Sequence, residues 1–178
     1  MDRKHSRKLL APALLFSIAA LVLLLKGFGV FPFPARGHMR RYADIEAVKA
    51  RLGIQKIPVP TYFPDNLQWP PSVILARKNP YPAVYMEFRD INSNGYALEI
   101  EEYARGEKPP GGDKVGLADV KEIISYPLKG KEAVLETGTC GGGGPCSRIS
   151  WDDGAFSVRV AMKSSPGPLI RISGSMID

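Results

Sequence analysis

The sequence predicts an α+β fold: a single N-terminal transmembrane helix, then one domain with an antiparallel sheet of about five to seven strands and a short helix at each end. Three observations predict it. A long uncharged apolar stretch follows a basic N-terminus. Three pairs of downstream segments alternate apolar and polar residues, the period of a half-buried strand. The 16 Pro and 18 Gly are more than a helical bundle tolerates.

Residues 9–25 form the predicted membrane span, and residues 1–8 form its cytoplasmic tail. As a helix, Leu9–Leu25 extends about 25 Å, close to the thickness of about 30 Å of a bilayer's hydrocarbon core. The four Lys and Arg before it place the N-terminus in the cytoplasm by the positive-inside rule. We therefore expect a single-pass inner (plasma) membrane protein, with the lipid bilayer as a partner and the domain in the periplasm or outside the cell.

A cleaved signal peptide is the alternative interpretation of this segment. Signal peptides have a shorter apolar core of about 7–15 residues and end in a small-x-small cleavage site. The nearest candidate site, Phe33-Pro34-Ala35, has Phe where a small residue belongs. Both interpretations place the domain outside the cytoplasm.

Residues 26–37 form a juxtamembrane linker, which Pro32 and Pro34 stiffen. Residues 38–178 form the extracytoplasmic domain, large enough for one core. Residues 1–37 hold six of the 24 basic residues and one of the 18 acidic residues, which leaves the domain 18 basic and 17 acidic residues. A nearly neutral domain lacks the positive surface that phosphate backbones require, so nucleic acid is not an expected partner.

The domain begins with a predicted short helix over residues 43–53. Ile45, Val48 and Leu52 share one helical face, and Gly53 suits a C-terminal cap. At the other end of the domain, residues 168–177 predict a short terminal helix.

Residues 57–71 are rich in proline, which favours extended backbone in the preceding residues. Tyr62, Phe63 and Trp69 give this segment a large apolar surface. One interpretation is a strap that packs across the sheet. The other is an aromatic lip that binds a ligand or peptide, which makes these three residues the candidate partner-binding site.

Alternating residues predict the strands. Three hairpins and one further strand are expected, at 84–89 with 96–101, 120–126 with 131–137, 149–151 with 156–162, and 72–76. Glu99 and Glu101 fall on the polar side of their strand, so we expect them to be solvated or paired with Arg89.

Cys140 and Cys146 are the two cysteines of the chain and enclose the sequence Gly-Gly-Gly-Gly-Pro. Outside the cytoplasm such a pair predicts a structural disulfide. A redox pair is the alternative, although the spacing is not Cys-x-x-Cys and no His adjoins it. Two thiolates need further ligands to bind zinc, and the glycine run lacks the Lys-Ser/Thr of a phosphate loop. No metal or cofactor is expected.

Three segments of the last third carry short motifs: Gly130–Val134, with a Gly-x-x-Ala pattern, Ile149–Phe156, with Trp-x-x-Gly, and Leu169–Met176, a closing helix with Ser near its end. With these motifs the last third resembles an uncharacterised bacterial extracytoplasmic domain found on sigma-factor regulators and envelope proteins. The resemblance implies an antiparallel sheet and a sensing or binding role, and it brings no catalytic residues.

These observations favour a membrane-anchored binding or sensory module of unknown ligand that is not an enzyme. We expect it to bind an envelope protein, a peptide or a lipid through residues 57–71 and the glycine loop between Cys140 and Cys146. Two alternatives remain open. One is a structural accessory subunit of an envelope complex. The other is a thiol–disulfide redox protein that uses Cys140 and Cys146.

Overall fold

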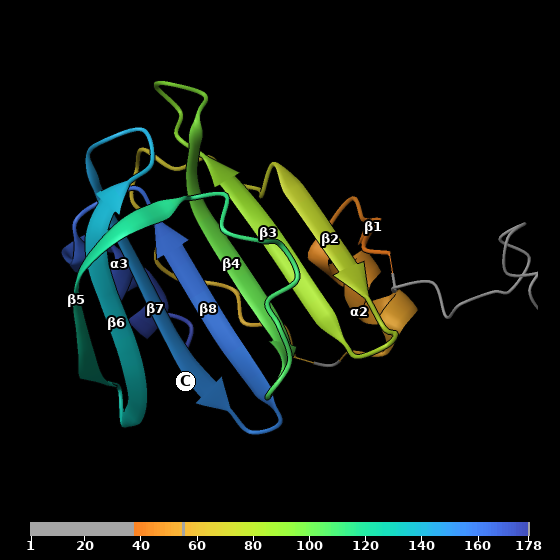
Figure 1. Ribbon diagram of the computed structural model, residues 1–178. Helices are drawn as coiled ribbons and strands as arrows, with labels where there is room; N and C mark the ends of the chain where they lie inside the picture. The colour runs from red at the N-terminus through yellow and green to blue at the C-terminus, as the bar shows by residue number, and fades with distance from the viewer. Residues whose placement is uncertain (1–37, 55, 178) are drawn as a thin grey trace, which may run out of the picture. The chain divides into compact units, whose positions relative to one another are not determined.

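The computed structural model describes residues 38–54 and 56–177 (Figure 1). The predicted cytoplasmic tail, the membrane span Leu9–Leu25 and the linker lie outside the described residues. In the part of the chain that is described, no helix is long and apolar enough to cross a bilayer.

A single antiparallel sheet dominates the domain, so its class is mainly β. Among the described residues the sheet has eight strands in the order β1-β2-β3-β4-β8-β7-β6-β5. The strands are β1 Arg40–Arg41, β2 Val73–Arg77, β3 Ala83–Arg89, β4 Tyr96–Ala104, β5 Leu117–Leu128, β6 Lys131–Cys140, β7 Pro145–Asp153 and β8 Phe156–Met162. The described helices are α2 Ile45–Leu52 and α3 Pro166–Gly174.

The strand order divides the sheet into two meanders. Strands β1 to β4 form one and β5 to β8 the other, and they join where β8 pairs with β4. The connection from β4 to β5, residues 105–116, therefore crosses from the middle of the sheet to its edge. All three predicted hairpins and the further strand at 72–76 are confirmed. The predicted strand number was one too low, because β1 has only two residues and no alternation to reveal it.

Both predicted helices are confirmed. Asp44 caps the start of α2, where its side chain accepts a hydrogen bond from the Ala47 amide at 2.7 Å. Gly53 ends α2 in the left-handed conformation, with φ 68°. Helix α3 begins at Pro166, whose missing N–H costs nothing at a first helical position.

We call the sheet face that carries α2, α3 and residues 57–71 the helix face. Both helices lie behind the sheet in Figure 1. Alternate residues of the strands point to this face and form the main core, as the two-residue period requires. Its members include Val84, Met86, Phe88, Leu98, Ile100, Ile149, Trp151, Val158, Val160, Leu169 and Ile172.

The opposite face, here called the loop face, is also buried over its centre. Residues 105–116 cross in front of the sheet in Figure 1 and cover side chains of β3, β4 and β8. Tyr85, Glu87 and Glu101 on this face are fully buried. The alternating pattern of the strands predicts one covered apolar face and one solvated polar face, which is wrong for this sheet. The second cover was missed because it is an irregular connection with no periodic pattern.

Candidate functional site

The aromatic strap, residues 57–71, lies across the helix face. The ring centroid of Phe63 is 5.1 Å from that of Trp69 and 5.2 Å from that of Phe88. Leu67 is buried in the core. Phe63 and Leu67 thus pack against the sheet, as the strap interpretation predicted.

Of the three candidate partner-binding residues, Trp69 is exposed, and Tyr62 and Phe63 are both partly buried. Trp69 is 52% exposed although its ring stacks over Phe88 at 6.2 Å. The Tyr62 ring lies 4.2 Å from the guanidinium carbon of Arg171 on α3. An open cavity of about 580 Å³ adjoins Tyr62 and is lined by Tyr62, Pro64, Tyr126, Gly167, Pro168, Ile170 and Arg171.

Backbone hydrogen bonds fix the strap along its length. The Tyr62 amide donates to Ser175 Oγ at 3.1 Å. The Gln68 amide donates to the Arg89 carbonyl at 2.8 Å. The strap therefore presents Trp69 and Tyr62 from a held backbone, so their accessible faces need no large rearrangement to meet a ligand.

The predicted disulfide between Cys140 and Cys146 is confirmed, with a Cα–Cα distance of 5.2 Å. It closes the β6–β7 hairpin. Both cysteines are buried in a small cluster with Val115, Leu117 and Ala161, where residues 105–116 enter β5. Sulfur atoms in such an enclosed apolar setting suit a structural crosslink better than thiol exchange, which requires an accessible sulfur.

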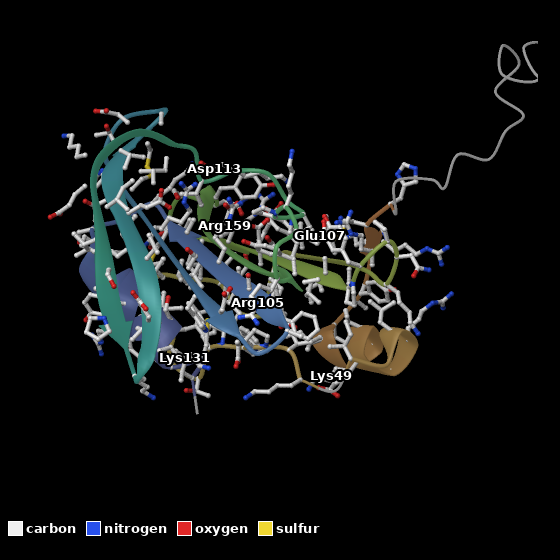
Figure 2. All side chains as sticks on the ribbon, turned by 60° about the horizontal axis from the view of Figure 1, so that its bottom comes forward. Lys49, Arg105, Glu107, Asp113, Lys131 and Arg159 are labelled. Carbon is white, nitrogen blue, oxygen red and sulfur yellow. A yellow bond between two sulfur atoms is a disulfide. The ribbon has the colours of Figure 1, made fainter. Side chains whose placement is uncertain are left out.

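The carboxylates on the loop face differ from the prediction. Glu99 and Glu101 are 2% and 0% exposed, and their basic partner is Arg159 of β8, not Arg89. The correction follows from topology: β8 pairs with β4 directly, and Arg159 lies opposite Glu101 in register. Figure 2 shows Arg159 on the sheet with Asp113 of the covering connection above it.

The connection closes this polar layer with its own backbone. The Gly111 amide donates to Glu101 at 2.7 Å, and Arg159 donates to the Gly112 carbonyl at 3.2 Å. A Cβ at Gly111 would lie 2.2 Å from the Tyr85 ring, so glycine alone permits this close approach. Lys114 pairs with Glu87 beside it.

Burial sets the protonation of this layer. Burial and the neighbouring Glu101 carboxylate raise the pKa of Glu99 to about 7, against the attraction of Arg159. Burial also raises the pKa of Glu101, and Arg159 opposes that rise. These carboxylates are enclosed by protein on every side the structure describes, which makes them part of the fold's polar layer.

Glu102 has a different environment, because it points to the helix face. Its neighbours in register are Val84 on β3 and Val158 on β8, both apolar. The residue is 5% exposed, and Oε2 has no hydrogen-bond partner among the described residues. Burial and then the charge of Asp153 raise the pKa of Glu102 to about 7.

Glu102 lines a cavity of about 580 Å³ at one end of the helix face. The walls come from the end of α2 and the residues after it, the β2–β3 turn and the β7–β8 hairpin. The lining residues are Leu52, Gly53, Ile54, Lys56, Pro58, Lys78, Pro82, Glu102, Asp153, Phe156 and Val158.

The sequence interpretation did not single out Glu102 as a functional residue, although a signal was present. Leu98, Ile100 and Glu102 are two residues apart, so the alternation that buries the first two also places Glu102 on the apolar face. The residues that complete the cavity come from distant segments, and no local pattern brings them together.

The fold and these sites define a mainly β domain with one covered antiparallel sheet, a fixed aromatic strap and a cavity with a buried carboxyl group. Comparisons of the chain with protein-family models, curated proteins and solved structures found no match. The resemblance of its last third to an extracytoplasmic domain therefore stays a prediction.

Proposed function

We propose that this chain is a membrane-tethered, extracytoplasmic binding module that captures an envelope protein or peptide through the aromatic strap. The observation that carries the proposal is Trp69, which stays 52% exposed while its ring stacks on Phe88 and lies tilted against Phe63. Exposed aromatic side chains on a fixed backbone are the groups that dominate binding energy at protein interfaces.

Preorganisation supports this use of the strap. Binding loses less conformational entropy when the contacting segment is already ordered. Hydrogen bonds to Ser175 and Arg89 order the strap on either side of Phe63. The groove beside Tyr62 gives a partner side chain a place to insert between the strap and α3.

The tether and the compartment are part of the same proposal. Leu9–Leu25 is long enough to enter a bilayer as a helix, and basic residues precede it. The disulfide is consistent with an oxidising compartment. Held in this way, the strap would meet partners that lie within reach of the membrane surface.

The test is photocrosslinking in membranes, with the full chain carrying a photoreactive residue at exposed position 68. We expect one discrete adduct with wild-type strap residues and at least a tenfold loss in the double variant Tyr62→Ala, Trp69→Ala. Ile91→Ala is the matched control, because Ile91 is 59% exposed in the β3–β4 turn and lies outside the strap. Equal adduct yields from all three proteins would refute binding through the strap.

A further inference from the structure

We propose that the cavity beside Glu102 is a second binding site, for a small ligand that carries one ammonium group on an apolar body. The site goes beyond the partner binding proposed above, because neither Tyr62 nor Trp69 lines it. Three observations carry the inference: the size and walls of the cavity, the unsatisfied carboxyl oxygen, and the charges around it.

The cavity has the dimensions of a small-molecule site. Its volume of about 580 Å³ falls within the range of about 300–1,000 Å³ that such sites occupy. Six apolar side chains from three separate segments form most of its wall: Leu52, Ile54, Pro58, Pro82, Phe156 and Val158. An apolar ligand body would replace water against these side chains.

Glu102 gives the apolar cavity a hydrogen-bond acceptor that can orient a ligand. Its Oε2 is buried and lacks a donor among the residues described, and its neighbours in register are valines that cannot supply one. A buried acceptor without a donor is unfavourable, and a bound ligand that donates to it removes that penalty. A hydrogen bond between ammonium and carboxylate is about twice as strong as one between neutral groups.

The surrounding charges favour a single ammonium group. Asp153 lines the same cavity and adds negative charge near Glu102. Its carboxylate accepts a hydrogen bond from Lys131 at 3.0 Å, whereas Glu102 Oε2 has no donor among the described residues. Lys56 and Lys78 also line the wall, so a ligand with more than one cationic group would be repelled.

The experiment compares three probes of similar shape on the full chain in detergent micelles: 2-phenylethylamine, 2-phenylethanol and 3-phenylpropanoate. Binding is measured from the NMR shifts of the Leu52 and Val158 methyl groups. At pH 8 we expect millimolar affinity for the amine, as suits so small a ligand, and at least tenfold weaker binding of the alcohol and the carboxylate. Between pH 8 and pH 5.5 the amine affinity should fall about tenfold or more, because Glu102 takes up a proton.

Two variants test whether Glu102 causes the preference for the amine and its pH dependence. Glu102→Gln should abolish both the amine preference and its pH dependence, and it preserves side-chain volume, so the cavity stays intact. Glu107→Gln is the matched control at an exposed carboxylate outside the cavity, and it should leave both unchanged. The absence of saturable methyl shifts with any probe would overturn the site. Equal binding of amine and alcohol, stronger binding of the carboxylate, or an amine preference that survives Glu102→Gln would overturn ammonium recognition.

Discussion

A single carboxyl group, that of Glu102, links ligand binding to stability. Its pKa in the folded protein is about 7, above the ordinary value of 4.5, because burial disfavours the charged form. The folded state then binds more protons than the unfolded state between these two values. The free energy of unfolding therefore falls as the pH rises through this window, and the destabilisation is fully present above pH 7.

Glu102→Gln should accordingly stabilise the protein at alkaline pH. We expect the free energy of unfolding to rise by about 3 kcal/mol at pH 8 and to change little at pH 4, where the carboxyl group is mostly protonated in both states. Urea denaturation at the two pH values measures the difference. A variant that is less stable than wild type at pH 8 would show that ionised Glu102 is satisfied in the folded protein.

Arg159 has the opposite role, since it compensates buried negative charge. It pairs with Glu101 and lies 3.8 Å from Glu99, and its own side chain is only 12% exposed. Arg159→Met leaves both carboxylates without this partner, so we expect a loss of about 3–5 kcal/mol at pH 8. The loss should shrink at pH 5, because protonation of Glu99 and Glu101 removes the uncompensated charge.

Arg105→Met is the matched control for Arg159. Arg105 pairs with Asp152 at 3.6 Å, but both side chains are more than half exposed. Solvent screening should limit its effect to less than about 1 kcal/mol. Similar losses in the two variants, measured by urea denaturation, would mean that the loop-face layer is not a closed low-dielectric environment.

At the level of single elements, the β5–β6 pair contains a position that only glycine can occupy. The register of this pair shifts near residues 119–122, and a Cβ on Gly138 would lie 1.9 Å from the Asp119 carbonyl oxygen. Gly138→Ala must open the strand pair, and we expect it to cost about 1–3 kcal/mol. Gly142→Ala should be nearly neutral in the same thermal unfolding assay, because nothing lies within 4 Å of its Cβ. Equal losses of stability in the two variants would show that Gly138 does not lie this close to Asp119.

The disulfide gives a second prediction at this level. Replacing Cys140 and Cys146 with Ser should lower stability by about 2 kcal/mol, the loop-closure entropy of so short a ring. In the native protein the burial of both cysteines should also slow reduction, and thiol labelling after mild reductant should increase sharply only once the domain unfolds. Rapid reduction of the native protein would instead support the thiol–disulfide alternative.

Local patterns account for most of the elements. Residues 84–89 and 96–101 form a hairpin because their alternation has a clear apolar side, and residues 43–53 form a helix because apolar spacing, an acidic start and a closing glycine agree. The loop face could not be predicted in this way. Gly111 and Arg159 are distant in sequence, and their meeting depends on β8 returning to pair with β4.

The candidate sites likewise differ in whether local sequence patterns or the tertiary fold brings their residues together. The strap was predictable because its aromatic and proline residues are consecutive. The Glu102 cavity was predictable only in part: the period places the carboxyl group on the apolar face, but α2, the β2–β3 turn and the β7–β8 hairpin assemble around it through the tertiary fold. The burial of Glu99 was not predicted, because its basic partner, Arg159, lies on β8, which is distant in sequence.

At the scale of the whole molecule, the strand order has a mechanical consequence. Within the sheet the two meanders join by β4–β8 pairing, and the 105–116 connection crosses from one to the other. The disulfide packs where that connection enters β5. The polar layer under the connection and the apolar core under the helices therefore stabilise the same central strands from both sides. We expect the domain to unfold as one cooperative unit, consistent with its size.

The proposed tether leads to the last prediction, which concerns the full chain in its cell. Because the basic charge is concentrated before and after Leu9–Leu25 while the domain is nearly neutral, the N-terminal segment should fix both membrane attachment and orientation. In intact cells stripped of any outer barrier, added protease should reach the domain, and the Cys140–Cys146 pair should be recovered oxidised. Replacing the four Lys and Arg before Leu9 with Ser should weaken the orientation and yield a reduced, protease-protected fraction. Recovery of the unaltered chain from the cytosol with both thiols free would contradict the tether and the compartment together.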